Sequence, residues 1–486
     1  MKTLVYKIIL LLLLINIDFA VGQSAYMRIV DKDFIPINNN NKSEMVVKNS
    51  NFRKILNKYK LVHFHQAFPT AKSEWLREAY FIEMESEKEL DNFIQAISEI
   101  YKSQIPLIEK LGKPILTADA FYPNDSLYVI GNLSHLDYVR APEAWNITKH
   151  YGKVKVGITD TYFYEAHPDL SFDAIYGSNS YINENDHGTI VSGFISGITN
   201  NQIGVASVGG FNTTLVASSN SYDNEVLLLA QLGCKVINCS WINGYTFCHF
   251  QDSLYNEILN THDCLVVFGA GNWSNHGGSL SVKAYPASYS ACMSVTSVGH
   301  KYDYGDSGYR NWKGVHCMVV NNPDSSHHHN EAVDVCAPGY EMQSTNYWRG
   351  QIYTDPLRCT GTSFAAPIVT GIAAMVRAVN PNLTAAQTMQ IIKETADASI
   401  YDIPENAPYI GQLGTGLVNA YAAVRKACAV DVENETYTSD ETLEGCIVTL
   451  KNVNVQNSSD LVIDAVVEAE LISNVEIPLG CSLEIR

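Results

Sequence analysis

One serine in this chain stands where it could act as a nucleophile. Ser363 lies in the string GTSFAAP, residues 361–367, and a mostly apolar run follows it from 368 to 376. The small residues and the proline predict a tight turn that leads into a helix. The dipole at the start of that helix would favour the negative charge of an acyl-transfer intermediate. A simple helix cap is the plainer interpretation, because Gly-Thr-Ser alone is more often a cap than a nucleophile.

A serine is a weak nucleophile unless a base and an orienting carboxylate assist it. The base candidate is His187, at the start of a predicted helix rich in small residues, although a lone histidine among 14 is more often structural. An imidazole suits general-base catalysis near neutral pH. The carboxylate candidate is Asp160, which follows an apolar strand over 154–158 and would fix the tautomer of His187. Asp186 is the alternative, but its adjacency in sequence places it poorly to hold the same ring.

A donor for the developing oxyanion is predicted at the end of another apolar run. Asn272 closes the string VVFGAGN, residues 266–272. Its amide could donate a hydrogen bond to the negative oxygen, with the backbone N–H of Ser363 as the second donor. A turn asparagine, common after glycine, is the alternative.

These strings together resemble the motifs of the subtilisin-like serine proteases, the subtilases. GTSFAAP resembles the family's nucleophile motif, NDHGTIVSGFISG its histidine motif, VKVGITDTYFYEAHPDL its aspartate motif and FGAGN its oxyanion segment. The order Asp160, His187, Ser363 is also the order found in subtilisin. The resemblance covers about 126–427 and implies that the substrate backbone is flanked by Ser240, Trp241, Gly269, Ala270 and Gly271.

The strings depart from the family pattern at three places. Ile190 stands where a second histidine is common, which leaves the base itself unaffected. Tyr162 replaces the usual glycine after Asp-Thr, and a glycine there suggests a backbone conformation that tyrosine disfavours. Ile242 and Asn243 interrupt the usual Ser-Trp-Gly, so the pocket should differ in shape.

The resemblance also implies a calcium site, although the chemistry itself requires no cofactor. Its elements would be Asp169 and the string TNNQIGV, residues 199–205. The ligands would be the side chains of Asp169 and Asn201 and the carbonyl oxygens of Thr199, Ile203 and Val205. Oxygen ligands of these kinds suit Ca²⁺, and a plain surface turn is the alternative. The three histidines at 327–329 could bind a transition metal, but an exposed polar loop is the favoured prediction.

Alternating strands and helices surround these candidates and must position them. The pattern predicts an α/β fold with a mostly parallel central sheet flanked by helices, which is the subtilisin-like arrangement. Expected strands are 154–158, 214–218, 236–239, 265–268, 293–298 and 333–336, and expected helices are 188–198, 223–232, 250–260 and 385–395. Asp160 and the 269–272 turn then stand at carboxyl ends of strands, where sites in such folds gather. We assign this catalytic domain to 123–428.

Two further regions precede the predicted catalytic domain. Residues 1–22 have a basic start, an apolar run over 8–17 and small residues before the expected cut, which predicts a secretory signal peptide too short to span a bilayer. The mature chain is therefore expected outside the cytoplasm, without a membrane anchor. Residues 23–122 contain a predicted strand–helix–strand unit, a small α+β region. It resembles an inhibitory subtilase pro-segment removed near 112–125, and an ordinary accessory domain is the alternative.

The last region, 429–486, is acidic and carries short β-like runs. We expect a small β-rich appendage or one end of a β-repeat, and its role in packing or tethering stays open. All 11 cysteines lie from Cys234 onward, and the three in or near this tail are the best candidates for a disulfide. Cys239, Cys336 and Cys359 are expected to be small buried residues. The net charge of −18 argues against nucleic acid as a partner.

Taken together, these features predict that the protein is a secreted serine endopeptidase. It would be made as a pre-pro-protein and would cleave proteins or peptides. The first alternative is a protein without enzymatic activity that keeps the fold as a scaffold. An inactive homologue of this kind would be expected to have lost a member of the triad. The second is a narrow maturation protease that cuts one partner and docks through its acidic tail.

Overall fold

The structure is a computed structural model, and the residues that it describes fall in fourteen stretches. These are 24–36, 47–59, 61–67, 77–84, 87–98, 100–110, 120–131, 133–180, 186–272, 281–299, 327–347, 359–473, 475–477 and 481–485. The predicted signal peptide lies outside them, as does most of the predicted maturation segment. The chain divides into two units, Met1–Thr117 and Ala118–Arg486.

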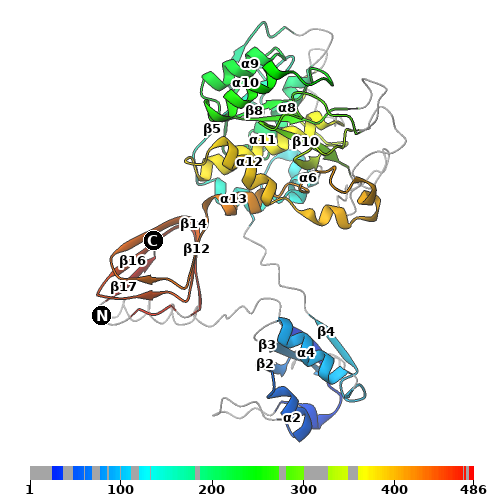
Figure 1. Ribbon diagram of the computed structural model, residues 1–486, viewed down its shortest axis with the longest axis vertical. Helices are drawn as coiled ribbons and strands as arrows, with labels where there is room; N and C mark the ends of the chain where they lie inside the picture. The colour runs from blue at the N-terminus through cyan, green and yellow to red at the C-terminus, as the bar shows by residue number, and fades with distance from the viewer. Residues whose placement is uncertain are drawn as a thin grey trace. The chain divides into compact units, whose positions relative to one another are not determined.

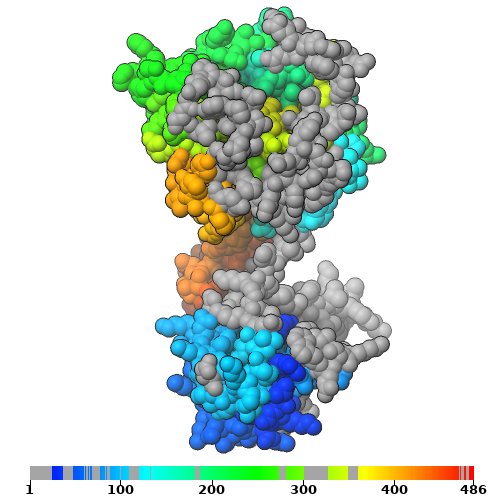
Figure 2. All heavy atoms as spheres, turned by 90° about the vertical axis from the view of Figure 1, so that its right-hand side faces the viewer, coloured from blue at the N-terminus to red at the C-terminus, as the bar shows by residue number. Residues whose placement is uncertain are grey.

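The N-terminal unit is an antiparallel sheet with two helices on its apolar face. The strands are β1 Ser24–Arg28, β2 Leu61–Gln66, β3 Ala79–Met84 and β4 Leu107–Lys110, in the order β2-β3-β1-β4. The helices are α2 Ser50–Leu56 and α4 Glu87–Ser98. Phe52 and Phe93 pack with Ile82 in one core, and the surface of this unit is coloured blue to cyan in Figure 2. The predicted strand–helix–strand is confirmed, and β1, β2 and α2 were not predicted.

The second unit is built on a seven-stranded sheet in which every neighbouring pair is parallel. The strands are β5 Val154–Thr159, β6 Phe172–Tyr176, β7 Thr213–Ser218, β8 Val236–Cys239, β9 Leu265–Gly269, β10 Cys292–Val298 and β11 Val335–Pro338. Their order is β11-β10-β9-β8-β5-β7-β6, which confirms the predicted fold class. The edge strand β6 was not predicted.

Helices cover both faces of this sheet. They are α7 Ala141–Thr148, α8 His187–Ser196, α9 Asp223–Gln231, α10 His249–Asn260, α11 Thr362–Val379, α12 Ala385–Glu394 and α13 Ala420–Cys428. Val236 of β8 packs in the core with α8 and α11, whereas its neighbour Ile237 packs with α9 and α10. Because successive strand residues point to opposite faces, the sheet is sandwiched, and Figure 1 shows α9 and α10 opposite α12 and α13.

Helix α11 lies at the centre of the larger core. Among the described residues it is the one helix long and apolar enough to cross a membrane, but 89% of that window is buried inside the protein. The sequence had predicted no spanning run after the leader. Burial on all sides explains this composition, because a helix that is apolar all round is typical of the core of a large domain.

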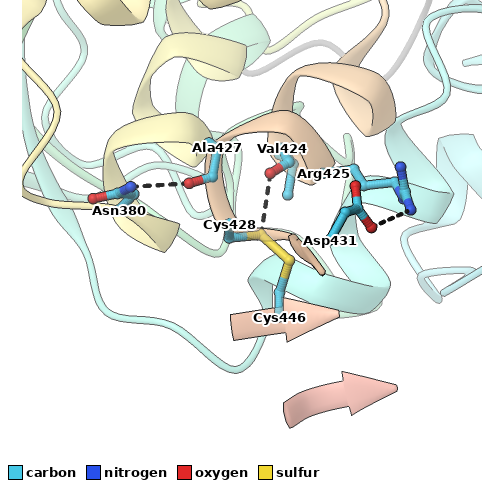
Figure 3. Close-up of a disulfide and its surroundings, with 7 residues drawn as sticks. All are labelled: Asn380, Val424, Arg425, Ala427, Cys428, Asp431 and Cys446. Atoms are coloured by element: carbon cyan, nitrogen blue, oxygen red, sulfur yellow. Dashed lines mark hydrogen bonds and ion pairs between the residues drawn. A yellow bond between two sulfur atoms is a disulfide. The ribbon is translucent and has the colours of Figure 1, made fainter. Parts of the chain in front are cut away.

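The C-terminal tail is a parallel β-coil that follows α13. Its strands are β12 Val430–Glu433, β13 Thr436–Tyr437, β14 Glu441–Lys451, β15 Asn454–Val455, β16 Asp460–Ser473 and β17 Ser482–Ile485, and the main sheet has the order β12-β14-β16-β17. The expected β-rich tail is confirmed, and its longest strand is β16 with 14 residues. A disulfide joins Cys428 to Cys446 at the start of the coil (Figure 3).

Candidate active site

The carboxylate and the base candidate lie together at the carboxyl end of β5. Asp160 directly follows β5 and is 2% exposed, and His187 is the first residue of α8. Nδ1 of His187 lies 2.8 Å and 2.9 Å from the two carboxylate oxygens of Asp160. The backbone N–H of Thr161 donates a further hydrogen bond to Oδ1 of Asp160 at 2.7 Å. With Nδ1 as the donor, Nε2 keeps the lone pair that a general base needs.

The charges around His187 favour its protonated form. Burial lowers the pKa of the imidazole, but the charge and hydrogen bond of Asp160 and the charge of Asp186 outweigh burial, so the pKa lies above 6.5. A neighbouring carboxylate therefore stabilises the imidazolium that would form when the base accepts a proton.

The nucleophile candidate stands on the first turn of the core helix. Ser363 is the second residue of α11, and the ring of Phe364, the next residue, packs on the ring of His187 with centroids 5.4 Å apart. The hydroxyl of Ser363 donates to the Ser240 carbonyl at 3.4 Å, and the Ser240 hydroxyl donates to the Ser363 carbonyl at 2.7 Å. This pair of contacts fixes the turn at the carboxyl end of β8. Gly361, which opens the turn, has a φ of 152°, where a side chain would be strained.

Asn272 is held so that its amide nitrogen is available as a donor. Its side-chain oxygen accepts from the backbone N–H of Thr362 at 3.0 Å and from the Thr362 hydroxyl at 3.3 Å. Since the oxygen faces the start of α11, the NH₂ group is the end that can reach an oxyanion beside Ser363. A Cβ on Gly361 would approach that nitrogen to 3.3 Å, so glycine keeps the approach open.

The predicted substrate-flanking residues follow two neighbouring strands. Ser240 and Trp241 come after β8, and the 269–271 segment ends β9, which pairs with β8. The indole N–H of Trp241 donates to the Thr159 hydroxyl at 2.8 Å, and the N–H of Ala270 donates to the Val295 carbonyl at 2.8 Å. Where the family pattern is interrupted, Asn243 and Gly244 pair with Tyr285 through two backbone hydrogen bonds of 2.8 Å each.

Tyr162 makes an aromatic contact, and the turn after Asp160 is not strained at this residue. Its φ is not positive, so the position does not require the glycine that the sequence comparison suggested. The Tyr162 ring lies 6.1 Å from that of Tyr347, which stacks on Tyr164 at 3.8 Å. The backbone N–H of Tyr347 donates to Asp186 at 2.6 Å, and this partner explains why Asp186 does not orient its neighbour His187.

Two buried carboxylates meet at the predicted calcium loop. Asp169 accepts from the Asn201 amide and from the N–H of Val205, each at 2.7 Å, and burial raises its pKa to about 7. Asp125 was not predicted, because an aspartate in a loop-rich lead-in carries no periodic signal. It accepts from the N–H of Asn200 at 2.7 Å, and burial raises its pKa as well. Among the described residues no group of three His, Cys, Asp or Glu side chains is arranged to hold a metal.

The histidines at 327–329 are buried, which corrects the expectation of an exposed loop. They are 3%, 3% and 0% exposed. Hydroxyls of β10 contact one ring nitrogen each of His327 and His329, and the distance from the Thr296 hydroxyl to Nδ1 of His329 is 2.9 Å. The backbone N–H of His328 donates to the Gly271 carbonyl at 3.0 Å. The histidine segment therefore pairs with the backbone next to Asn272. Cys239, Cys336 and Cys359 are buried as predicted.

A family model and curated relatives point to one family. The model of the subtilase family matches residues 152–427, more than half of the chain. Halolysin from Haloferax mediterranei is 28% identical over 63% of this chain. This match covers 56% of the length of halolysin. Subtilisin Savinase from Lederbergia lenta is 30% identical over 59% of this chain and 96% of its own length. The crystal structure of MycP1 without its N-terminal propeptide gives a TM-score of 0.47 at 22% identity, covering 60% of this chain and 96% of that one.

Proposed function

The chain belongs to the subtilase family and is a subtilisin-like serine endopeptidase, and from this premise we propose that Asp160, His187 and Ser363 form its catalytic triad. The observation that carries the proposal is the contact of both Asp160 oxygens with Nδ1 of His187, at 2.8 Å and 2.9 Å. The helix that bears Ser363 packs against this histidine through Phe364. Both features favour transfer of the serine proton to Nε2.

The proposed reaction proceeds through an acyl-enzyme. Oγ of Ser363 attacks the carbonyl carbon of the scissile bond while Nε2 of His187 accepts the hydroxyl proton. The Asn272 amide and the Ser363 N–H donate hydrogen bonds to the oxyanion of the tetrahedral intermediate. His187 then donates its proton to the departing amine, which leaves an ester on Ser363. A water molecule, deprotonated by His187, cleaves that ester, releases the new carboxylic acid and restores the hydroxyl.

We further propose that the enzyme is made as a secreted pre-pro-protein, with 1–22 as the signal peptide and 23–122 as the pro-segment. The compact N-terminal unit, with a core of its own, supports an independently folding pro-segment that could inhibit the enzyme before removal. The substrates would then be extracytoplasmic proteins or peptides, cut after the pro-segment is released near 112–125.

A structural calcium ion is a separate proposal. The buried carboxylates of Asp169 and Asp125 both accept hydrogen bonds from the 199–205 loop. Their pKa values are raised, and a cation there would stabilise their ionised forms. Asp169, Asn201 and the carbonyls of Thr199, Ile203 and Val205 would hold the ion, with the Asn201 amide turned to present its oxygen. The ion would fix this loop without entering the reaction. A Tm that rises with Ca²⁺ in wild type, but not in Asp169→Asn, would support the site, and equal Tm shifts would count against it.

Labelling with a fluorophosphonate tests the nucleophile. We expect one covalent adduct by intact mass on wild type and none on Ser363→Ala, with wild type alone trimmed near 112–125. Thermal unfolding of both proteins controls for folding. If folded wild type without its pro-segment gives no adduct, the chain is a scaffold rather than an enzyme.

A further inference from the structure

A second buried carboxylate lies beside the proposed base. Asp186 precedes His187 in the chain and is the N-cap residue of α8, but its side chain makes no capping hydrogen bond with that helix. It is 7% exposed, and its Oδ2 accepts the backbone N–H of Tyr347 at 2.6 Å. Burial of a carboxylate is unfavourable unless the group is paired. Capping of α8 therefore does not account for an aspartate at this position.

The partner of this carboxylate is the last residue of a segment, 344–347, that we call the strap. The hydroxyl of Ser344 donates to the carbonyl of Ile190 at 2.7 Å, and the hydroxyl of Thr345 donates to the carbonyl of Thr189 at 2.7 Å. Both carbonyls belong to the first turns of α8. The strap therefore runs along the start of the helix that carries the base, and the aspartate is a third point of attachment.

The charge of Asp186 opposes the field of the helix. His187 is the first residue of α8, which is 10 residues long. A helix has a partial positive charge at its N-terminus, which disfavours a cation there. Helix α8 by itself would therefore make His187 harder to protonate. The negative charge of Asp186 has the opposite effect, and together with Asp160 it raises the pKa of the imidazole.

Other groups beside these two residues come from different elements. Asp160 at the end of β5 binds Nδ1 of His187. Phe364 of α11 packs an uncharged ring on the imidazole. Burial and the charge of Asp186 raise the pKa of the Cys359 thiol, so this group stays neutral. The charges that bear on the base from these neighbours are therefore those of the two aspartates.

We propose that Asp186 is a positioning residue of the reaction, which offsets the helix field at His187 by its charge and attaches the strap beside the base. The inference rests on the proposed function, because it takes His187 as the general base. Asp160 orients the ring through Nδ1, and Asp186 adds to the affinity of the ring for the serine proton. The consequence is an enzyme whose activity begins at a higher pH than Asp160 alone would set.

Asp186→Asn tests the role of the charge, because the amide oxygen can still accept the N–H of Tyr347. Without the anion the pKa of His187 falls, so the base becomes neutral at a lower pH. The acidic limb of the kcat/KM profile should move down by about 0.5 pH unit, the size expected of one charge at a helix terminus. On the plateau kcat should fall less than about tenfold, because a less basic imidazole is a weaker general base.

Two control variants separate charge from structure. Ser344→Ala removes a contact of the strap but keeps the charge of Asp186, so it should lower Tm and leave the acidic limb in place. Glu165→Gln removes an exposed carboxylate that also follows β5, and it should leave both unchanged. If Ser344→Ala moves the limb as far as Asp186→Asn does, the aspartate has only a structural role and the proposal is wrong.

A second measurement does not depend on catalysis. In a Ser363→Ala background, NMR titration of ¹⁵N-labelled histidines gives the pKa of the imidazole directly, and His187→Gln identifies its signal. Asp186→Asn should lower this pKa by the same amount as it moves the limb. An unmoved pKa would overturn the role of Asp186 and leave the triad intact. Absence of a fluorophosphonate adduct on wild type would instead overturn the triad itself.

Discussion

The two larger parallel sheets among the described residues connect their strands in different ways. In the seven-stranded sheet helices connect the strands and cover both faces, so spatial neighbours such as β5 and β8 are far apart in sequence. In the main sheet of the tail, the strands lie side by side in the order in which they occur along the chain, β12, β14, β16 and β17. The described residues between them form no helix. Parallel strands need a crossover, and the catalytic unit uses helices where the tail uses short turns of a coil.

This difference decides where chemistry can occur. Helical crossovers bring Asp160, His187 and Ser363, which are distant in sequence, to one edge of a sheet that is shielded by helices. In the coil each strand stacks on the strand before it, so it forms ladders of like residues rather than a concave site. The first sheet is thus suited to a reaction and the second to the stacking of like residues.

The largest expected effect is at the end of β5. Asp160→Asn should lower kcat by about 10⁴-fold, because the neutral amide no longer fixes the tautomer or stabilises the imidazolium. The pKa of His187 is now above 6.5, and the base must be neutral, so activity is lost as pH falls through that pKa. Without the anion, the acidic limb of the kcat/KM profile should move to lower pH.

Initial rates on a quenched peptide at several pH values measure both effects. Asp464→Asn, an exposed carboxylate of β16, is the matched control and should leave the profile unchanged. A small loss in Asp160→Asn, with the acidic limb unmoved, would contradict the assignment of Asp160.

Asn272→Ala should have the next largest effect. Loss of one oxyanion donor typically costs about 10²–10³-fold in kcat, with little change in KM. The side-chain oxygen also accepts from Thr362, so thermal unfolding must be measured to separate lost catalysis from a loosened α11. A loss confined to KM would show that Asn272 binds substrate without stabilising the oxyanion.

Ion pairs of the two regions should differ in their contribution to stability. Arg377 is buried at 3% exposure and contacts Asp263 at 2.7 Å, so Arg377→Met should cost about 3 kcal/mol, the low end for a buried pair because Asp263 is 36% exposed. Lys451 and Glu433 of the tail pair at 2.7 Å but are 44% and 53% exposed, and Lys451→Met should cost less than about 1 kcal/mol. Urea unfolding in the Ser363→Ala background measures both.

The Asp263 pair also predicts a pH dependence. Burial opposes the charge of Asp263, but hydrogen bonds from Arg377 and Lys235 outweigh it and lower the pKa of the carboxyl below 3.8. The stabilisation is therefore full above the ordinary pKa of the unfolded chain and is lost as pH falls below it. Arg377→Met should flatten the acid side of the stability curve, and a parallel curve would contradict this account.

The candidate site could be proposed from the sequence because the residues expected to form it lie in short motifs. Asp160, His187, Ser363 and Asn272 each follow or begin an element whose periodicity is plain in the sequence. Asp125 was missed because its burial depends on the 200–201 backbone, 75 residues away.

The polar composition of a segment gave a wrong prediction of exposure where its partners lie far away in the sequence. The histidines at 327–329 read as an exposed loop, but Thr296 and Ser297 of β10 provide hydrogen-bond partners. Strands β1 and β6 are short, and their pairing is set by partners such as β3 and β7 that lie elsewhere in the sequence. Local patterns cannot reveal such contacts, since they depend on the assembled sheet.

The smallest expected effect on activity is at the joint between the two sheets. Cys428→Ser removes the disulfide, which closes a loop with a sequence separation of 18, and should lower the free energy of unfolding of the tail by about 2–3 kcal/mol. Activity should stay within about twofold of wild type, because Asn380 still holds the end of α13 through the Ala427 carbonyl at 2.9 Å. Calorimetry in the Ser363→Ala background would then resolve a separate, earlier transition for the tail. Cys481→Ser, which alters a free thiol in the same coil, is the control and should keep a single transition. If Cys428→Ser instead lowers the stability of both sheets equally, the coil is part of the enzyme's own folding unit, and the contrast between the two sheets holds for their topology but not for their cooperativity.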